Sequence, residues 1–199
     1  MEKQVIISIS REFCSGGHMI GEYIAKALGL SFCDRNMLDE IAQRKNIRIE
    51  YLEKYDEKPR NLILSRRVGA FSNSIEDIIA EMQFEYLRDK ASSGESFVVV
   101  GRCADSVLRS RKCLIPIFVM GDEEERIAEA CRRYNISRDE AISKMRRHDR
   151  TRKQYHNRYS EGKWGDSRYY DMCVNSSKLG IEKTAVLLTE YIRQRVEQF

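Results

Sequence analysis

The chain has 199 residues, of which 42% are hydrophobic and 33% charged, a composition that suits one folded domain and excludes wholesale disorder. No apolar run is long enough to cross a membrane and the first residues do not read as a signal peptide, so we expect a cytoplasmic protein with no membrane partner. The net charge of +4 is unevenly spread, because residues 144–168 hold nine basic and three acidic side chains, which indicates an anionic ligand for that segment.

Strand-like and helical patterns alternate along the chain. β-branched or continuously apolar runs of strand length alternate with segments whose apolar residues recur at helical spacing. In chain order, we expect a strand at 5–10, a helix ending at Gly29, a strand at 30–33, helices at 37–45, 50–58 and 74–91, strands at 97–100 and 113–120, helices at 122–134 and 137–158, a strand at 171–174 and a helix at 180–197. Ser137 and Glu140 have the spacing of a capping box at the start of one of these helices.

This alternation predicts a three-layer α/β/α domain of about five parallel strands with helices on both faces. We expect one domain over residues 1–199, in which residues 36–90 form a helical insert and residues 144–168 a basic lid. Ligands of such a sheet bind beyond the carboxyl ends of the strands. The loops that follow Ser10, Cys33, Val100 and Met120 are therefore the candidates for a site.

The first candidate is the glycine-containing loop of residues 10–21, which joins the first strand to the first helix. Such a turn directs several backbone N–H groups of a helix start at one place, where they can bind phosphate. The loop is not a strict P-loop, since Gly17, His18 or Met19 stands where the lysine and the serine or threonine of that motif belong. The alternative is a strand-to-helix turn that needs glycine for its flexibility.

The second candidate is Gly101-Arg102 with Asp105, directly after the apolar strand at 97–100. A guanidinium at the carboxyl end of a strand suits a phosphate or the edge of a base. The alternative is a surface ion pair between Arg102 and Asp105.

The third candidate is the basic segment itself, in which Arg147 and Arg150 are spaced to share one helix face. Phosphoryl transfer needs positive charge over the transferred group, and a mobile basic flap can supply it while excluding water. The segment also fits a solvated helix face, or a nucleic-acid surface of basic and aromatic residues. We expect His148 and His156 to lie at the surface of this segment.

Taken together, these motifs resemble the cytidylate kinase-like family of nucleoside monophosphate kinases. The resemblance covers residues 5–195 and depends on the joint order of short motifs that are each loose. They are REFCSGGH, GRCAD, DRTR, KWGD and YDMCVNSSKLGIEK. It implies a P-loop NTPase-like fold, and ATP-dependent phosphoryl transfer to a nucleoside monophosphate, with CMP or dCMP the first candidates and Mg²⁺ accompanying ATP.

The resemblance also implies roles for particular residues. Binding of the ATP phosphates falls to the loop, binding of the acceptor to the ends of two strands, and neutralisation of the developing charge to arginines. These sets are Ser15, Gly16, Gly17 and His18 for ATP, then Asp34, Arg35, Arg102 and Asp105 for the acceptor, then Arg11, Arg147, Arg150 and Arg152 as catalytic arginines. Asp149 would orient the arginines or reach magnesium through water, and no residue is expected as a direct metal ligand.

The chain departs from this family at the P-loop lysine, which is absent, and two accounts fit. Arg11 or an arginine of the lid replaces its charge in an active kinase, or the protein binds nucleotide without efficient transfer. Nucleic-acid binding through residues 144–168 is a further alternative.

Overall fold

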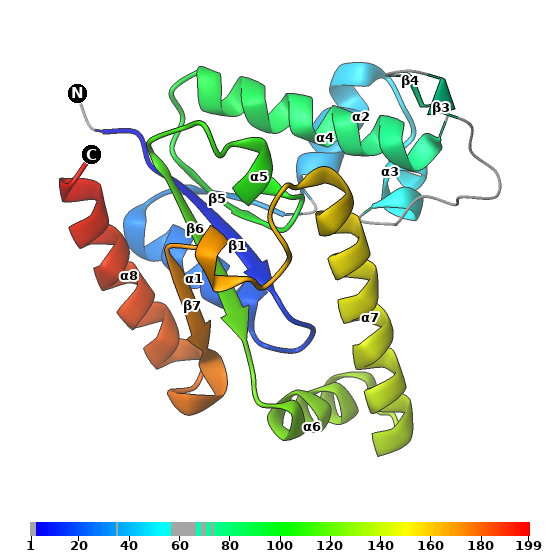
Figure 1. Cartoon of the computed structure of the whole chain (residues 1–199), viewed down its shortest axis with the longest axis vertical. Helices are drawn as coiled ribbons and strands as arrows, with labels where there is room; N and C mark the ends of the chain where they lie inside the picture. The colour runs from blue at the N-terminus through cyan, green and yellow to red at the C-terminus, as the bar shows by residue number, and fades with distance from the viewer. Residues whose placement is uncertain (1–2, 35, 57–66, 69–70, 73) are drawn as a thin grey trace.

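A five-stranded parallel sheet forms the centre of the protein, which we describe from a computed structural model that covers residues 3–34, 36–56, 67–68, 71–72 and 74–199 (Figure 1). Its strands are β1 (Ile6–Arg11), β2 (Ser31–Cys33), β5 (Phe97–Val100), β6 (Leu114–Met120) and β7 (Met172–Asn175). They lie in the order β2-β5-β1-β6-β7, and every neighbouring pair is parallel. The predicted number and direction of strands are confirmed.

Helices cover both faces of the sheet. One apolar cluster packs α1 (Gly17–Leu28) and α8 (Ile181–Glu197) on one face, and a second packs α2 (Asn36–Lys45), α3 (Ile49–Tyr55), α4 (Ile75–Ser92) and α5 (Ala104–Val107) on the other. Successive residues of β1 serve opposite clusters, since Ile6 belongs to one and Ile7 to the other. The continuous apolar run of β5 is buried on both sides, as expected of a central parallel strand.

Two further helices, α6 (Glu123–Tyr134) and α7 (Arg138–Tyr159), stand near the ends toward which the strands point (Figure 1). They pack against Phe13 of the loop after β1 in a smaller apolar cluster. The predicted capping box starts α7: Ser137 Oγ accepts from the Glu140 backbone N–H, and Glu140 Oε2 accepts from the Ser137 backbone N–H at 2.9 Å. These helices close one side of the space beyond the sheet.

Some elements differ from those expected. The short helix α5 and the two-residue strands β3 (Arg67–Val68) and β4 (Phe71–Ser72) were not predicted, since runs this short carry no readable periodicity. The helix expected over 50–58 is α3, and residues 57–58 lie outside the described residues. All six cysteines are free thiols. Within the described ranges, no helix combines the length and the apolar character that a membrane span requires.

Candidate functional site

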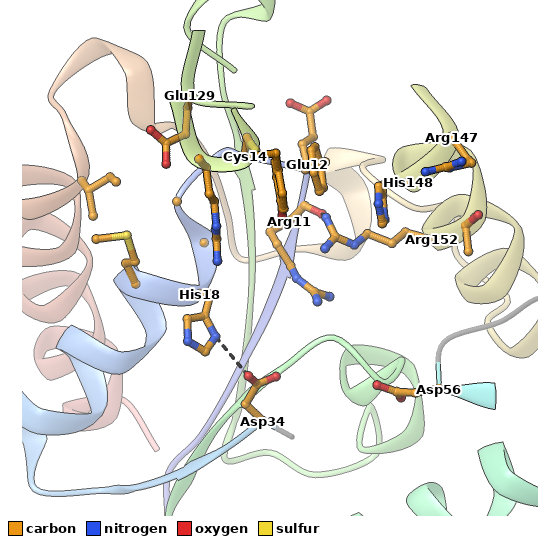
Figure 2. A pocket seen from close by; sticks show the side chains of 18 of the residues that line it. Arg11, Glu12, Cys14, His18, Asp34, Asp56, Glu129, Arg147, His148 and Arg152 are labelled. Atoms are coloured by element: carbon orange, nitrogen blue, oxygen red, sulfur yellow. Dashed lines mark hydrogen bonds and ion pairs between the residues drawn. The ribbon is translucent and has the colours of Figure 1, made fainter. Parts of the chain in front are cut away.

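A cavity of about 920 Å³ opens beyond the carboxyl ends of β1, β2 and β5, between the start of α1 and the side of α7 (Figure 2). It lies where ligands bind in open α/β sheets, because the connections that leave the carboxyl ends of β1 and β5 diverge there, to α1 on one face of the sheet and to α5 on the other. Strand ends contribute Arg11, Asp34 and Arg102 to its wall, and α7 contributes Arg147 and Arg152.

The loop after β1 carries its own anion-binding geometry. Gly16 has φ of 77°, in the left-handed region that suits glycine, and α1 starts at the next residue. A Cβ at Gly16 would lie 2.7 Å from Ile181 Cγ1, so the loop also packs too closely against α8 for any larger residue. The first amides of a helix have no partner within the helix, and no side chain of the described residues caps this one. Gly16, Gly17 and His18, three of the residues expected to bind the ATP phosphates, line the cavity.

A buried arginine that sequence reasoning missed fixes this loop to α6 and α7. Arg126 Nε donates to Phe13 O at 2.8 Å, Arg126 Nη1 lies 3.0 Å from Glu12 Oε2, and Nη2 pairs with Asp149. Asp149 in turn accepts from the Phe13 backbone N–H at 2.7 Å. Asp149 therefore orients the loop and α7 through Arg126, which is only 6% exposed.

The arginines of α7 do not share one role. Arg147 and Arg152 line the cavity together with His148 and Thr151. These four residues share one face of α7, because residues four apart, such as Arg147 and Thr151, are neighbours on a helix. Arg150 is exposed and is not among the described residues that line the cavity. The structure thus brings two of the three predicted lid arginines to the site.

The basic segment is not a separate flap. The carboxyl-terminal half of α7 is tied to α4, because Arg158 donates two hydrogen bonds to Asp77, at 2.8 and 2.9 Å, and Tyr155 Oη donates to Gln83 at 3.4 Å. The middle of α7 is tied to the loop after β1 through Asp149. Residues 144–159 of the basic segment thus belong to a helix that is anchored at two levels, and the action of the segment as a lid stays a prediction.

Between α1 and the end of β2, His18 Nδ1 lies 3.2 Å from Asp34 Oδ2, an ion pair if the imidazole is protonated (Figure 2). Burial alone would raise the pKa of Asp34, but the hydrogen bond to His18 and the positive charge of Arg102 outweigh burial and lower it. Asp34 is therefore a carboxylate at neutral pH. Arg35 lies outside the described residues.

Arg102 is 3% exposed and pairs with Asp56 at 2.9 Å. Its backbone has φ of 60°, and Cys103 follows with φ of 52°. Two successive residues other than glycine in the left-handed region store strain, a feature that clusters at functional sites.

Two predicted site residues, Ser15 and Asp105, are buried in contacts with other parts of the protein. Ser15 is buried, and its hydroxyl donates to Glu12 O and Val119 O, each at 3.0 Å. Asp105 is buried 2.7 Å from His156 Nε2, so the prediction that His156 lies at the surface is wrong. His148 is half-buried and stacks on Phe13 with ring centroids 4.4 Å apart. Its pKa is lowered by burial first, and then by the charges of Arg152 and Lys144.

The carboxylates of the cavity fit Mg²⁺ bound to a nucleotide rather than a resident metal. In the part of the chain that the structure describes, no three His, Cys, Asp or Glu side chains gather into a metal site. Mg²⁺ on a nucleotide keeps several waters and needs only one or two carboxylates beside the phosphates. Asp34, an ionised carboxylate on the wall beside the phosphate loop, meets that need.

Comparison with known proteins agrees with this architecture. A sequence model of the cytidylate kinase-like family matches residues 6–178. The structure of an uncharacterized protein from Eubacterium ventriosum ATCC 27560 is similar at a TM-score of 0.76 and 31% identity, covering 96% of this chain and 99% of that one. Shikimate kinase from Bacteroides thetaiotaomicron is similar in fold, at a TM-score of 0.57 and 13% identity over 95% of this chain and 98% of that one. Shikimate kinase from Acinetobacter baumannii is also similar in fold, at a TM-score of 0.54 and 14% identity over 97% of this chain and 95% of that one. The search of curated proteins found no match.

Proposed function

Because the chain belongs to the cytidylate kinase-like family, we propose that it transfers the γ-phosphoryl group of ATP to a nucleoside monophosphate, with CMP and dCMP as the first candidates. The observation that carries the proposal is one cavity in which the start of α1 faces Arg11 of β1, Arg102 of the turn after β5 and two arginines of α7. Such an arrangement suits a ligand with several phosphate groups, because both the amides and the guanidinium groups favour oxyanions.

In the proposed reaction, an oxygen of the acceptor phosphate forms a bond to the γ-phosphorus of ATP. The bond from the γ-phosphorus to the β–γ bridging oxygen breaks, and ADP leaves with that electron pair. Phosphoryl transfer depends mainly on positioning and on charge stabilisation, and an ionised acceptor phosphate has no proton to lose. Mg²⁺ bound to ATP would supply further positive charge, and Asp34 is the carboxylate of the cavity wall that would help to hold it.

The residues of the cavity divide this work. The amides at the start of α1 hold the ATP phosphates, and Arg102 holds the acceptor from the end of β5. Arg147 and Arg152 neutralise charge on the transferred group from the side of α7. The ties from Asp149 and Asp77 to neighbouring elements hold α7 in place, which lowers the cost of reorganisation during transfer.

The test is ADP release, coupled to a spectroscopic readout, with Mg²⁺, ATP and each of CMP, dCMP, UMP, AMP and GMP in turn. We expect release that depends on CMP or dCMP, and a loss of activity in Arg152→Ala. Lys153→Ala is the matched control, since Lys153 is the exposed neighbour of Arg152 on the same helix and is not among the described lining residues. Equal activity of both variants, or release that no acceptor stimulates, would contradict the proposal.

A second candidate is nucleotide binding without transfer. The glycine at position 17 favours it, since a kinase of this fold normally has a lysine beside the phosphates. It predicts MgATP binding in calorimetry together with no ADP release in the same preparation.

A further inference from the structure

Arg11 fills the space that a side chain at position 17 would need. A Cβ built on Gly17 would lie 2.5 Å from Arg11 Cβ and 3.0 Å from Arg11 Cγ, closer than such atoms approach in proteins. Unlike Gly16, Gly17 is not among the glycines with positive φ, so its backbone would accept any L-residue. Glycine occupies position 17 because the stem of Arg11 leaves no room for a larger residue.

The same two positions matter in the P-loop motif, G-x-x-x-x-G-K-[ST]. With Gly16 as the second glycine of the motif, Arg11 stands at its first glycine and Gly17 at its lysine. The chain therefore has an arginine where the motif has glycine, and a glycine where the motif has the cation. One substitution removes the charge from the helix start, and the other adds a charge at the end of β1.

Arg11 is placed to use that charge. It is the last residue of β1 and pairs in register with Val119 of β6, so its backbone is held by the sheet. Its side chain lines the cavity, and Figure 2 shows it extending into the space between Asp34 and α7. Arg152 approaches from α7, where its Nη1 donates to Arg11 O at 3.4 Å. Two guanidinium groups therefore share one cavity, an arrangement that an anionic ligand stabilises.

We propose that Arg11 takes the place of the P-loop lysine, contacting the β- and γ-phosphate oxygens from the end of β1, and that Gly17 is its obligatory counterpart. The inference rests on the proposed function and concerns how the donor is held in the same site. The planar guanidinium can bind two phosphate oxygens at once, whereas a lysine acts as a single charged point. Arg11 then offsets the charge that develops on the β–γ bridging oxygen as ADP leaves.

Exchange of the two residues tests this arrangement. We expect Arg11→Gly to lower kcat by about a hundredfold to a thousandfold, the usual cost of one preorganised charge contact. Gly17→Lys alone should also lose activity, because the stem of Arg11 occupies its space. The double variant Arg11→Gly/Gly17→Lys has both room and charge, and should regain about tenfold or more over Arg11→Gly. The double variant Arg11→Gly/Gly17→Ala, which has room without charge, should regain nothing.

A second pair of variants tests the role of Arg11 without a substitution at position 17, so the result does not depend on how the loop accommodates a larger residue there. Arg11→Lys keeps a cation and Arg11→Gln removes it at nearly the same size, so MgATP affinity by calorimetry should fall about tenfold or more only in Arg11→Gln. Thermal melting checks that each variant is folded. If the wild type binds MgATP but turns over no acceptor, this affinity comparison still decides the role of Arg11, while the proposed function fails. Unchanged MgATP affinity in Arg11→Gln, or no difference between the two double variants, would overturn the inference.

Discussion

His156 and Asp105 form a pair that water does not reach. His156 Nε2 lies 2.7 Å from Asp105 Oδ2, and the two residues are only 4% and 3% exposed. The pair joins α7 to α5, the short helix directly after the Gly101-Arg102 turn. A buried polar pair is costly to form and more costly to break, because removal of one member leaves the other without compensation.

We therefore expect His156→Ala to lower the free energy of unfolding by about 3–5 kcal/mol, since it leaves a carboxylate buried without its partner. The double variant Asp105→Asn/His156→Ala should lose less, because the group left behind is a neutral amide. Urea unfolding followed by circular dichroism measures both. Equal losses in the single and the double variant would show that lost packing, rather than the stranded charge, sets the cost.

Asp34 predicts a dependence of stability on pH. Its pKa in the folded protein is below the usual value, so the folded state favours the ionised form more than the unfolded state does. The stabilisation is fully present above the unfolded pKa and is lost as pH falls through the folded pKa. The difference in unfolding free energy between wild type and Asp34→Asn should therefore shrink as the pH is lowered from about 6 to about 3. Urea midpoints across that range measure it, and a difference that grows in acid would refute this assignment.

At the scale of elements, α7 decides which charges face the ligand. The helix is tied to α4 through Asp77 and to the loop after β1 through Asp149, so its rotation about its own axis is fixed. Sequence spacing alone grouped Arg147 with Arg150, because residues three apart are neighbours on a helix. These contacts orient α7 so that Arg147 and Arg152 line the cavity, whereas Arg150 lies on the exposed side of the helix.

This orientation predicts unequal effects along one helix. Arg147→Ala should lower kcat/KM by about tenfold to a hundredfold, as expected from the loss of a charge-assisted hydrogen bond. Arg150→Ala should change it by less than about threefold, since Arg150 is not among the described residues that line the cavity. Steady-state kinetics with MgATP and the best acceptor provide the measurement. A large effect of Arg150→Ala would mean that α7 rotates or shifts when the ligand binds.

At the scale of the whole molecule, the fold followed from the sequence more completely than the site did. Alternating apolar runs and helical periodicities identified all five strands of the sheet. The pattern is strongest in β5 and β6, where burial on both faces leaves a continuous apolar run. The burial of Arg126 could not be predicted, since its partners Glu12 and Asp149 come from other elements. In the sequence, an arginine after three glutamates resembles the solvated start of a helix. The burial of His156 was missed for the same reason, because it depends on Asp105, which comes from a distant part of the sequence.

The distribution of charge over the described residues favours a nucleotide ligand in the cavity over a nucleic acid on the surface. Part of the positive charge of residues 144–168 is paired with acidic side chains, because Arg158 pairs with Asp77 and Arg168 with Asp166. Arg147 and Arg152 of the same segment face the cavity. A mononucleotide in the cavity can reach those two guanidinium groups together with the start of α1, whereas a polymer on the outer surface would use exposed residues such as Arg150.

We therefore expect MgATP to raise the thermal midpoint of unfolding, with a stabilisation of about 2.7 kcal/mol at a hundred times its Kd. A single-stranded DNA or RNA oligomer should compete poorly for a fluorescent ATP analogue, both at low salt and at about 0.15 M salt. The opposite outcome is an oligomer that binds more tightly than MgATP, with an affinity that falls steeply as salt is raised. That result would assign residues 144–168 to phosphate contacts along a polymer, and Arg150→Ala would then weaken binding as much as Arg152→Ala does. Nucleotide binding and nucleic-acid binding thus make opposite predictions for Arg150, because a ligand in the cavity contacts the side of α7 that lines it, whereas a polymer would contact the exposed side.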